Sequence, residues 1–245
     1  YKKEYMGEVS ISDAFANSIN TVAVKLSESI GRENVIKTAK SLGVNSPLLD
    51  SPSIALGTSE VNLLELTSAY NVLANNGNGI FVHGIRSIEN TSGKLLFMRE
   101  GSGPGKVLDS FVVSTMTKMM EQTITSGTGR KAKINRPAAG KTGTSQSLRD
   151  AWFVGFTSDL VVGVWFGNDN DSPMNEITGG TAPAILWSDF MQKAHNGVPV
   201  KSLNYASEKK RKKFRNDDKI NRIISKSKRL NQQKSVFERI LDNFF

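Results

Sequence analysis

The stretch AAGKTGTSQSLRDAWFVGFTSDLVVGVWFG, residues 138–167, decides the fold of this chain. It holds three runs typical of β-strands, at 138–144, 151–157 and 160–167, and the last two are rich in Val, Phe and Trp. A tight polar turn at 158–159 joins the second run to the third, and such short connections favour antiparallel neighbours. We therefore predict an antiparallel sheet in this part of the chain.

Helical periodicity on both sides of this stretch predicts the helices that cover the sheet. Small polar residues at Ser18 and Asn20 interrupt the first helical segment, so we expect a break between two helices there. Thr58 is the expected N-cap of the third segment, and a hairpin is predicted around the turn 90–93. The helical segments are residues 10–30, 32–42, 58–76, 109–125 and 181–195. This order indicates an α/β fold with an antiparallel sheet flanked by helices.

The residue composition limits the chemistry that the chain can perform. None of the 245 residues is a cysteine, which excludes disulfides and thiolate sites. The two histidines, His83 and His195, are not spaced as metal ligands, so we expect no metal and no cofactor. No apolar run reaches the roughly 18 residues of a transmembrane helix.

The net charge of +9 belongs to one end of the chain. Residues 201–245 carry 14 basic and 5 acidic residues, whereas residues 1–200 carry 18 of each kind. We expect a domain over 1–200 and a flexible basic C-terminal tail over 201–245 that ends in a short amphipathic helix. The tail lacks interleaved aromatic residues, so nucleic-acid binding is not expected.

The first strand-like run carries the sequence Lys141-Thr142-Gly143-Thr144. These residues suit the anionic end of a peptide, because the lysine supplies charge and the threonine hydroxyls donate hydrogen bonds. The glycine lets a substrate backbone lie against the strand. The tripeptide Lys-Thr-Gly alone is a weak signal, and it gains weight from its place on a strand.

The second candidate is Ser18-Ile19-Asn20, at the expected break between two helices. In isolation, such a Ser-x-Asn sequence is typical of a helix cap. Its place upstream of the Lys-Thr-Gly strand matters more, because penicillin-recognising serine enzymes carry the motifs Ser-x-x-Lys, Ser-x-Asn and Lys-Thr-Gly in that order.

Longer stretches around these two motifs resemble class A penicillin-binding proteins, and they resemble β-lactamases much less. The stretches are residues 13–26, 55–70, 138–146, 150–169 and 179–191. The resemblance covers roughly residues 1–195 and is specific as a combination. It implies part of the serine β-lactamase/D,D-transpeptidase fold, and it identifies the chain as the C-terminal part of such a transpeptidase domain.

The resemblance also implies a role for each motif residue. Ser18 would relay protons between the lysine of the first motif and the leaving amine, and Asn20 would hold the side-chain amide of the donor peptide. Lys141 would maintain a positive field and hold Ser18. Thr142 and Thr144 would bind the terminal carboxylate of a D-Ala-D-Ala stem or of a β-lactam, and the backbone N–H of Thr144 would form half of the oxyanion hole.

The first motif of the family, with its nucleophilic serine, does not occur before Ser18. Two Ser-x-x-Lys matches, 207–210 and 225–228, lie in the lysine-rich tail, where chance accounts for them. Loss of the nucleophile costs another serine hydrolase about 10⁶-fold in turnover. We therefore expect this chain to be inert by itself.

For the parent protein, the resemblance implies a cell-wall cross-linking enzyme at the periplasmic face of the cytoplasmic membrane. Its partners would be peptidoglycan stem peptides and β-lactams, with a membrane anchor and a glycosyltransferase domain upstream of this chain. Two alternatives stay open: a D,D-carboxypeptidase or β-lactamase-related hydrolase, and a non-catalytic remnant that binds cell wall or a partner. In the second alternative the basic tail and residues 236–245 could contact anionic lipid.

Overall fold

Three antiparallel strands form the central sheet of the computed structural model, which describes residues 7–101 and 103–205. They are β5 (Ala139–Thr144), β6 (Asp150–Phe156) and β7 (Val161–Gly167), in the order β5-β6-β7. The predicted strands and their antiparallel pairing are confirmed. Among the described strands β5 pairs with β6 alone, so it is an edge strand of this sheet.

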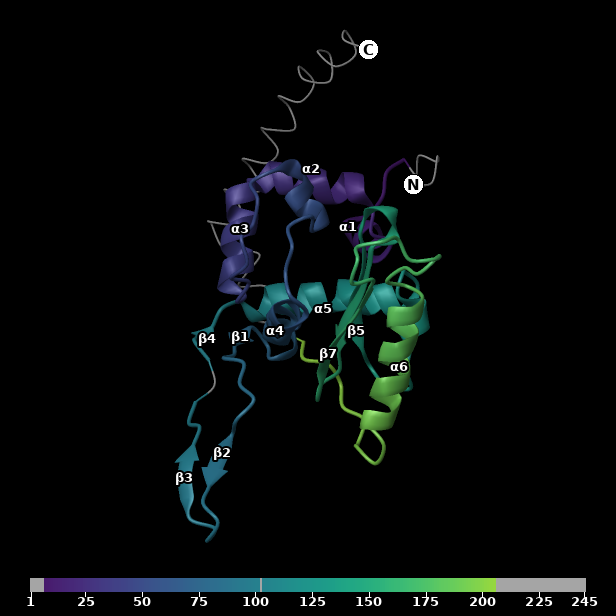
Figure 1. The fold of residues 1–245 in the computed structure, drawn as a ribbon. Coiled ribbons are helices and arrows are strands. Elements are labelled where there is room, and N and C mark those ends of the chain that lie inside the picture. Colours follow the sequence, from purple (N-terminus) through teal and green to yellow (C-terminus); the bar gives the residue numbers. More distant parts are fainter. Residues whose placement is uncertain (1–6, 102, 206–245) are drawn as a thin grey trace.

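The described residues form six α-helices, and Figure 1 shows their arrangement around and beside the sheet. They are α1 (Ile11–Ala16), α2 (Asn20–Ile30), α3 (Arg32–Ser41), α4 (Leu63–Ala74), α5 (Ser110–Thr125) and α6 (Ala182–Ala194). Three short 3₁₀ turns lie at Pro52–Leu56, Arg130–Ala132 and Gln146–Leu148. The expected break at Ser18 is confirmed, because α1 ends and α2 begins on either side of it.

The start of α4 differs from the sequence prediction. Thr58 does not cap this helix, because its hydroxyl donates to Ser53 Oγ at 2.8 Å. Asn62 is the N-cap instead, and its side chain accepts from the backbone N–H of Glu65 at 2.8 Å. Both residue types cap helices well, so the prediction chose the wrong one of two suitable residues.

The helices cover both faces of the sheet. Side chains alternate between the two faces along a strand, so Phe153 and Phe156 of β6 point in opposite directions. Phe153 packs on Trp187 of α6 with ring centroids 5.2 Å apart, whereas Phe156 belongs to a cluster with Met120 of α5. Both phenylalanines are at most 1% exposed. The sheet is therefore the middle layer of a sandwich, with α4 and α5 on one face and α6 on the other.

A second pair of strands stands apart from this sandwich (Figure 1). β2 (Ser87–Glu89) and β3 (Leu95–Met98) form the predicted antiparallel hairpin, and β1 (Asn78–Gly79) pairs with β4 (Gly105–Lys106) at its base. Large apolar side chains of the hairpin arm are 43–61% exposed. They are Phe81, Val82, Ile85, Ile88, Leu95, Leu96, Phe97 and Met98.

The last described residues pack against the sandwich. Leu203 is 4% exposed and belongs to the cluster around Phe156, and Lys201 Nζ lies 2.5 Å from Asp159 Oδ1. Residues 206–245, including the expected terminal helix and both Ser-x-x-Lys matches of the tail, lie outside the described residues. The division into 1–200 and 201–245 therefore stays a prediction. None of the described helices is long and apolar enough to span a bilayer.

Candidate active site

Ser18 lies in the short turn between α1 and α2, with a backbone φ of +55°. A residue other than glycine in this left-handed conformation costs about 1–3 kcal/mol, and such residues cluster at functional sites. The turn is held by two backbone bonds, from Ser18 N to Phe15 O at 3.1 Å and from Ile19 N to Ala14 O at 2.9 Å. The strained turn leaves the Ser18 side chain exposed beside the sheet.

Lys141 of β5 joins this turn to the sheet. Its Nζ donates to Ser18 Oγ at 2.9 Å, across 123 positions of sequence, and also to the carbonyl of Thr142 at 3.2 Å. The same Nζ lies 5.7 Å from the ring centroid of Phe15, within range of a cation–π interaction. The fold therefore brings together the two motifs that the sequence singled out.

Burial changes the acidity of this lysine. It lowers the pKa of Lys141 to about 8, because removing an ammonium group from water disfavours its charged form. A group with a pKa this close to neutrality can both hold and release a proton under physiological conditions. Lys141 is thus suited to move a proton to or from the hydroxyl that it contacts.

Thr142 contacts a residue that the sequence analysis did not single out. Its Oγ1 lies 2.7 Å from Oγ1 of Thr128, in the turn after α5. The neighbouring Gly127 is the sequence feature that marks this close approach. A Cβ at that position would lie 2.2 Å from the carbonyl oxygen of Ala16. Only glycine permits this approach, and it brings the turn after α5 against the end of α1.

The far end of β5 is covered by the segment before α6. Thr144 Oγ1 accepts from the backbone N–H of Gly179 at 3.0 Å and keeps its own proton to donate. A Cβ on Gly179 would lie 2.4 Å from the Gly143 carbonyl oxygen, so this close packing again requires glycine. Thr144 and Gly143 therefore lie beside a second glycine turn.

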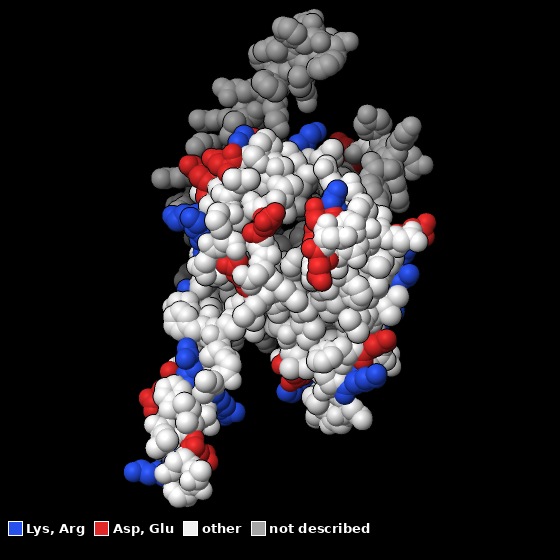
Figure 2. Space-filling view, viewed as in Figure 1, with Lys and Arg blue, Asp and Glu red and all other residues white. Residues whose placement is uncertain are grey.

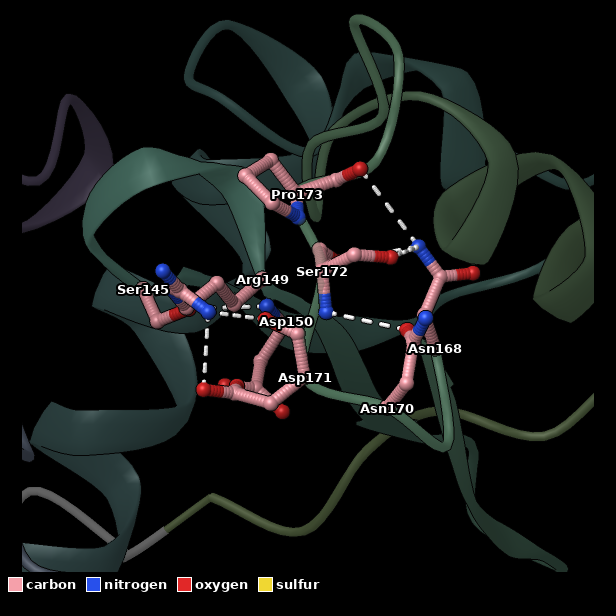
Figure 3. A network of polar contacts seen from close by, with 8 residues as sticks. All are labelled: Ser145, Arg149, Asp150, Asn168, Asn170, Asp171, Ser172 and Pro173. Carbon is pink, nitrogen blue, oxygen red and sulfur yellow. Dashed lines mark hydrogen bonds and ion pairs between the residues drawn. The ribbon is translucent and has the colours of Figure 1, made fainter.

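A network of polar contacts ties this segment down, as Figure 3 shows. Arg149 Nη1 lies 2.7 Å from Asp171 Oδ2, and Leu148 O accepts from the backbone N–H of Met174 at 2.9 Å. Within the loop that follows β7, Asn168 Nδ2 donates to the carbonyl of Ser172 at 2.9 Å. The loop that follows Thr144 is thus joined to the loop that leads to Gly179.

The structure brings Ser18, Lys141 and Thr142 together, with Thr128 beside them. Asn20 is not hydrogen-bonded to this group through its side chain within the described residues. Asn20 is the first residue of α2 and is exposed. Within residues 7–101 and 103–205, no hydrogen bond joins its side chain to the other motif residues. In that part of the chain, no group of three His, Cys, Asp or Glu side chains could hold a metal ion.

Known proteins match this chain in sequence. The family profile of the penicillin binding protein transpeptidase domain matches residues 1–191. Penicillin-binding protein 1A of Aquifex aeolicus is 38% identical over 195 residues, which are 78% of this chain and 26% of that protein. Penicillin-binding protein 2D of Bacillus subtilis is 35% identical over 200 residues, with coverages of 78% and 28%. The chain thus spans about a quarter of the length of these relatives.

Solved structures match in fold. Penicillin-Binding Protein 1A from Haemophilus influenzae aligns with a TM-score of 0.75 at 23% identity, covering 82% of this chain and 36% of that one. The PonA1 protein from Mycobacterium tuberculosis, solved in complex with penicillin V, aligns with a TM-score of 0.76 at 24% identity, with coverages of 83% and 61%. These alignments confirm the predicted serine β-lactamase/D,D-transpeptidase fold class. Sequence and fold together show that the chain belongs to the transpeptidase domain family of the class A penicillin-binding proteins.

Proposed function

We propose that this chain is part of a serine-type D,D-transpeptidase that cross-links peptidoglycan and binds β-lactams. The observation that carries the proposal is the 2.9 Å contact between Lys141 Nζ and Ser18 Oγ. It joins the Ser-x-Asn and Lys-Thr-Gly motifs, which are distant in sequence, at one point beside an edge strand.

The proposed chemistry is acyl transfer through a serine ester. The nucleophilic hydroxyl loses its proton and its oxygen forms a bond to the carbonyl carbon of the penultimate D-Ala, while the peptide C–N bond breaks and the leaving amine takes up a proton. An acceptor amine then attacks the ester carbonyl and loses a proton, and the serine oxygen leaves and regains one. Ser18 passes that proton, because a hydroxyl can accept from one neighbour while it donates to another. Lys141 assists because its pKa of about 8 lets it exchange a proton with the Ser18 hydroxyl.

The substrate backbone is proposed to lie along β5, on the side away from β6. Ser145 N–H donates to Asp150 O, toward β6, at 3.0 Å. Consecutive N–H groups of a strand point to opposite sides, so the N–H of Thr144 points away from β6. This direction supports its role in the oxyanion hole. Thr142 and Thr144 supply hydroxyls for the ligand carboxylate, and Asn20 is proposed to hold the donor side-chain amide.

The nucleophile is proposed to come from a Ser-x-x-Lys segment outside these 245 residues, because none precedes Ser18 in the sequence. On this proposal the chain is inert alone and active within its complete gene product. We propose that this product lies at the periplasmic face of the cytoplasmic membrane, with an anchor and a glycosyltransferase domain upstream. Its donor substrates are stem peptides that end in D-Ala-D-Ala.

Intact mass after incubation with benzylpenicillin tests both parts of this proposal. We expect the complete gene product to gain the mass of one penicillin and the 245-residue chain to gain none. An adduct on the 245-residue chain would overturn the external nucleophile, and Ser18 would then be the first residue to substitute. If the complete gene product stays unmodified, the transpeptidase proposal itself is wrong.

A further inference from the structure

The turn Gly127-Thr128-Gly129 contacts both halves of the site. The backbone N–H of Thr128 donates to the carbonyl of Ala16 at 3.0 Å, two residues before Ser18. Its side chain reaches Thr142 Oγ1 at 2.7 Å on β5. One residue therefore connects the turn that carries Ser18 to the strand that carries Lys141 and Thr142.

The backbone of this turn is fixed on two sides. A Cβ on Gly127 would lie 2.2 Å from the Ala16 carbonyl oxygen, and a Cβ on Gly180 would lie 2.4 Å from the Thr128 carbonyl oxygen. Such contacts leave little room for the turn to move. The backbone of Thr128 is thus held in place, while the residue itself remains exposed to solvent.

Either hydroxyl can donate in the contact between Thr128 and Thr142. Thr128 Oγ1 has two possible acceptors, Thr142 Oγ1 at 2.7 Å and Ala16 O at 3.4 Å. Hydroxyl hydrogen bonds are about 2.5–3.0 Å long, so the Thr142 contact is the stronger one. If Thr128 donates to Thr142, the proton of Thr142 is free for another acceptor. A carboxylate has no proton and can only accept, so a bound carboxylate requires this direction.

We propose that Thr128 is a positioning residue, whose hydroxyl turns the Thr142 hydroxyl proton toward the carboxylate of the ligand. The inference rests on the proposed function, because it needs an anionic ligand at Thr142. The chain of bonds from Thr128 through Thr142 to the carboxylate strengthens each member, since hydrogen bonds in series polarise one another. Thr128 itself does not touch the reacting atoms.

The test is a double-mutant cycle on the complete gene product, read as the second-order rate constant of acylation by benzylpenicillin. We expect Thr128→Val to lower this constant about tenfold, the size of a lost charge-assisted hydrogen bond. In a Thr142→Val background, Thr128→Val should change the acylation rate constant by less than about twofold, because Thr128 acts through Thr142. Thr128→Ser keeps the hydroxyl and should restore the wild-type rate.

Two controls separate positioning from a loss of structure. Thr125→Val removes another exposed threonine hydroxyl, one on the last turn of α5, and should leave acylation unchanged. The Tm of each variant reports folding. A Thr128→Val loss of the same size in both backgrounds, or one that Ser does not restore, would overturn the inference. A wild-type protein that is not acylated would instead overturn the proposed function.

Discussion

The central sheet and the β2–β3 hairpin are built alike and covered differently. Both are antiparallel and rich in large apolar residues. In the sheet, Phe153 is fully buried between helices, whereas Leu96 and Met98 of the hairpin are 61% and 55% exposed. Figure 2 shows the hairpin as an arm that projects from the body, with charged residues scattered over uncharged surface. An apolar strand pattern thus predicts a strand but does not reveal what covers it.

The two regions also differ in what their strands can do. β5 pairs with β6 and packs against α5, and it holds Lys141 Nζ 2.9 Å from Ser18 Oγ. An isolated two-stranded hairpin is only marginally stable and cannot hold side chains with the same accuracy. Packing of helices against a sheet therefore supplies the rigidity that a precise arrangement of side chains needs.

The largest expected effect comes from removing the same side chain in each region. Phe153→Ala leaves a cavity between β6 and α6, and we expect it to lower the free energy of unfolding by about 3–5 kcal/mol. Phe97→Ala, at a site that is 43% exposed on the hairpin, should change it by less than about 0.5 kcal/mol. Thermal unfolding of the two variants would compare them. An equal loss would mean that Phe97 is covered in solution as fully as Phe153.

A smaller effect is expected from adding one methyl group in each region. Gly179→Ala places a Cβ about 2.3 Å from the Trp152 carbonyl oxygen, so the segment before α6 must move away from β5. We expect a loss of about 1–3 kcal/mol in stability, together with slower acylation by penicillin. Gly84→Ala on the hairpin arm meets nothing within 4 Å and should be neutral for both readouts. Acylation at the wild-type rate in Gly179→Ala would show that this contact does not support the site.

Much of the sheet could be predicted from the sequence, because runs rich in Val, Phe and Trp and the short turn between them are local signals. The break at Ser18 was also a local signal, since small polar residues interrupt the first helical segment there. Thr128 was not, because its partners Ala16 and Thr142 lie 112 and 14 positions away, and no local pattern encodes such contacts. Gly127 was the one local feature that pointed to this contact. Its importance depends on the carbonyl of Ala16, which only the fold brings near it.

The last expected effect is a slope of at most about 1.4 kcal/mol per pH unit, and it tests whether burial changes chemistry as well as rigidity. Burial lowers the pKa of Lys141 from 10.5 to about 8, so between these pH values the unfolded chain binds more protons than the folded one. The contribution of Lys141 to the free energy of unfolding therefore rises from pH 8 to pH 10.5. Lys141→Met removes this titration, and its stability should rise less with pH than that of the wild type. Lys94→Met, in the turn of the exposed hairpin, controls for the loss of one lysine. If the Lys141→Met and wild-type curves run parallel in denaturation experiments across this window, the sheet does not bury Lys141 enough to change its acidity, and Ser18 has a fully protonated partner at neutral pH.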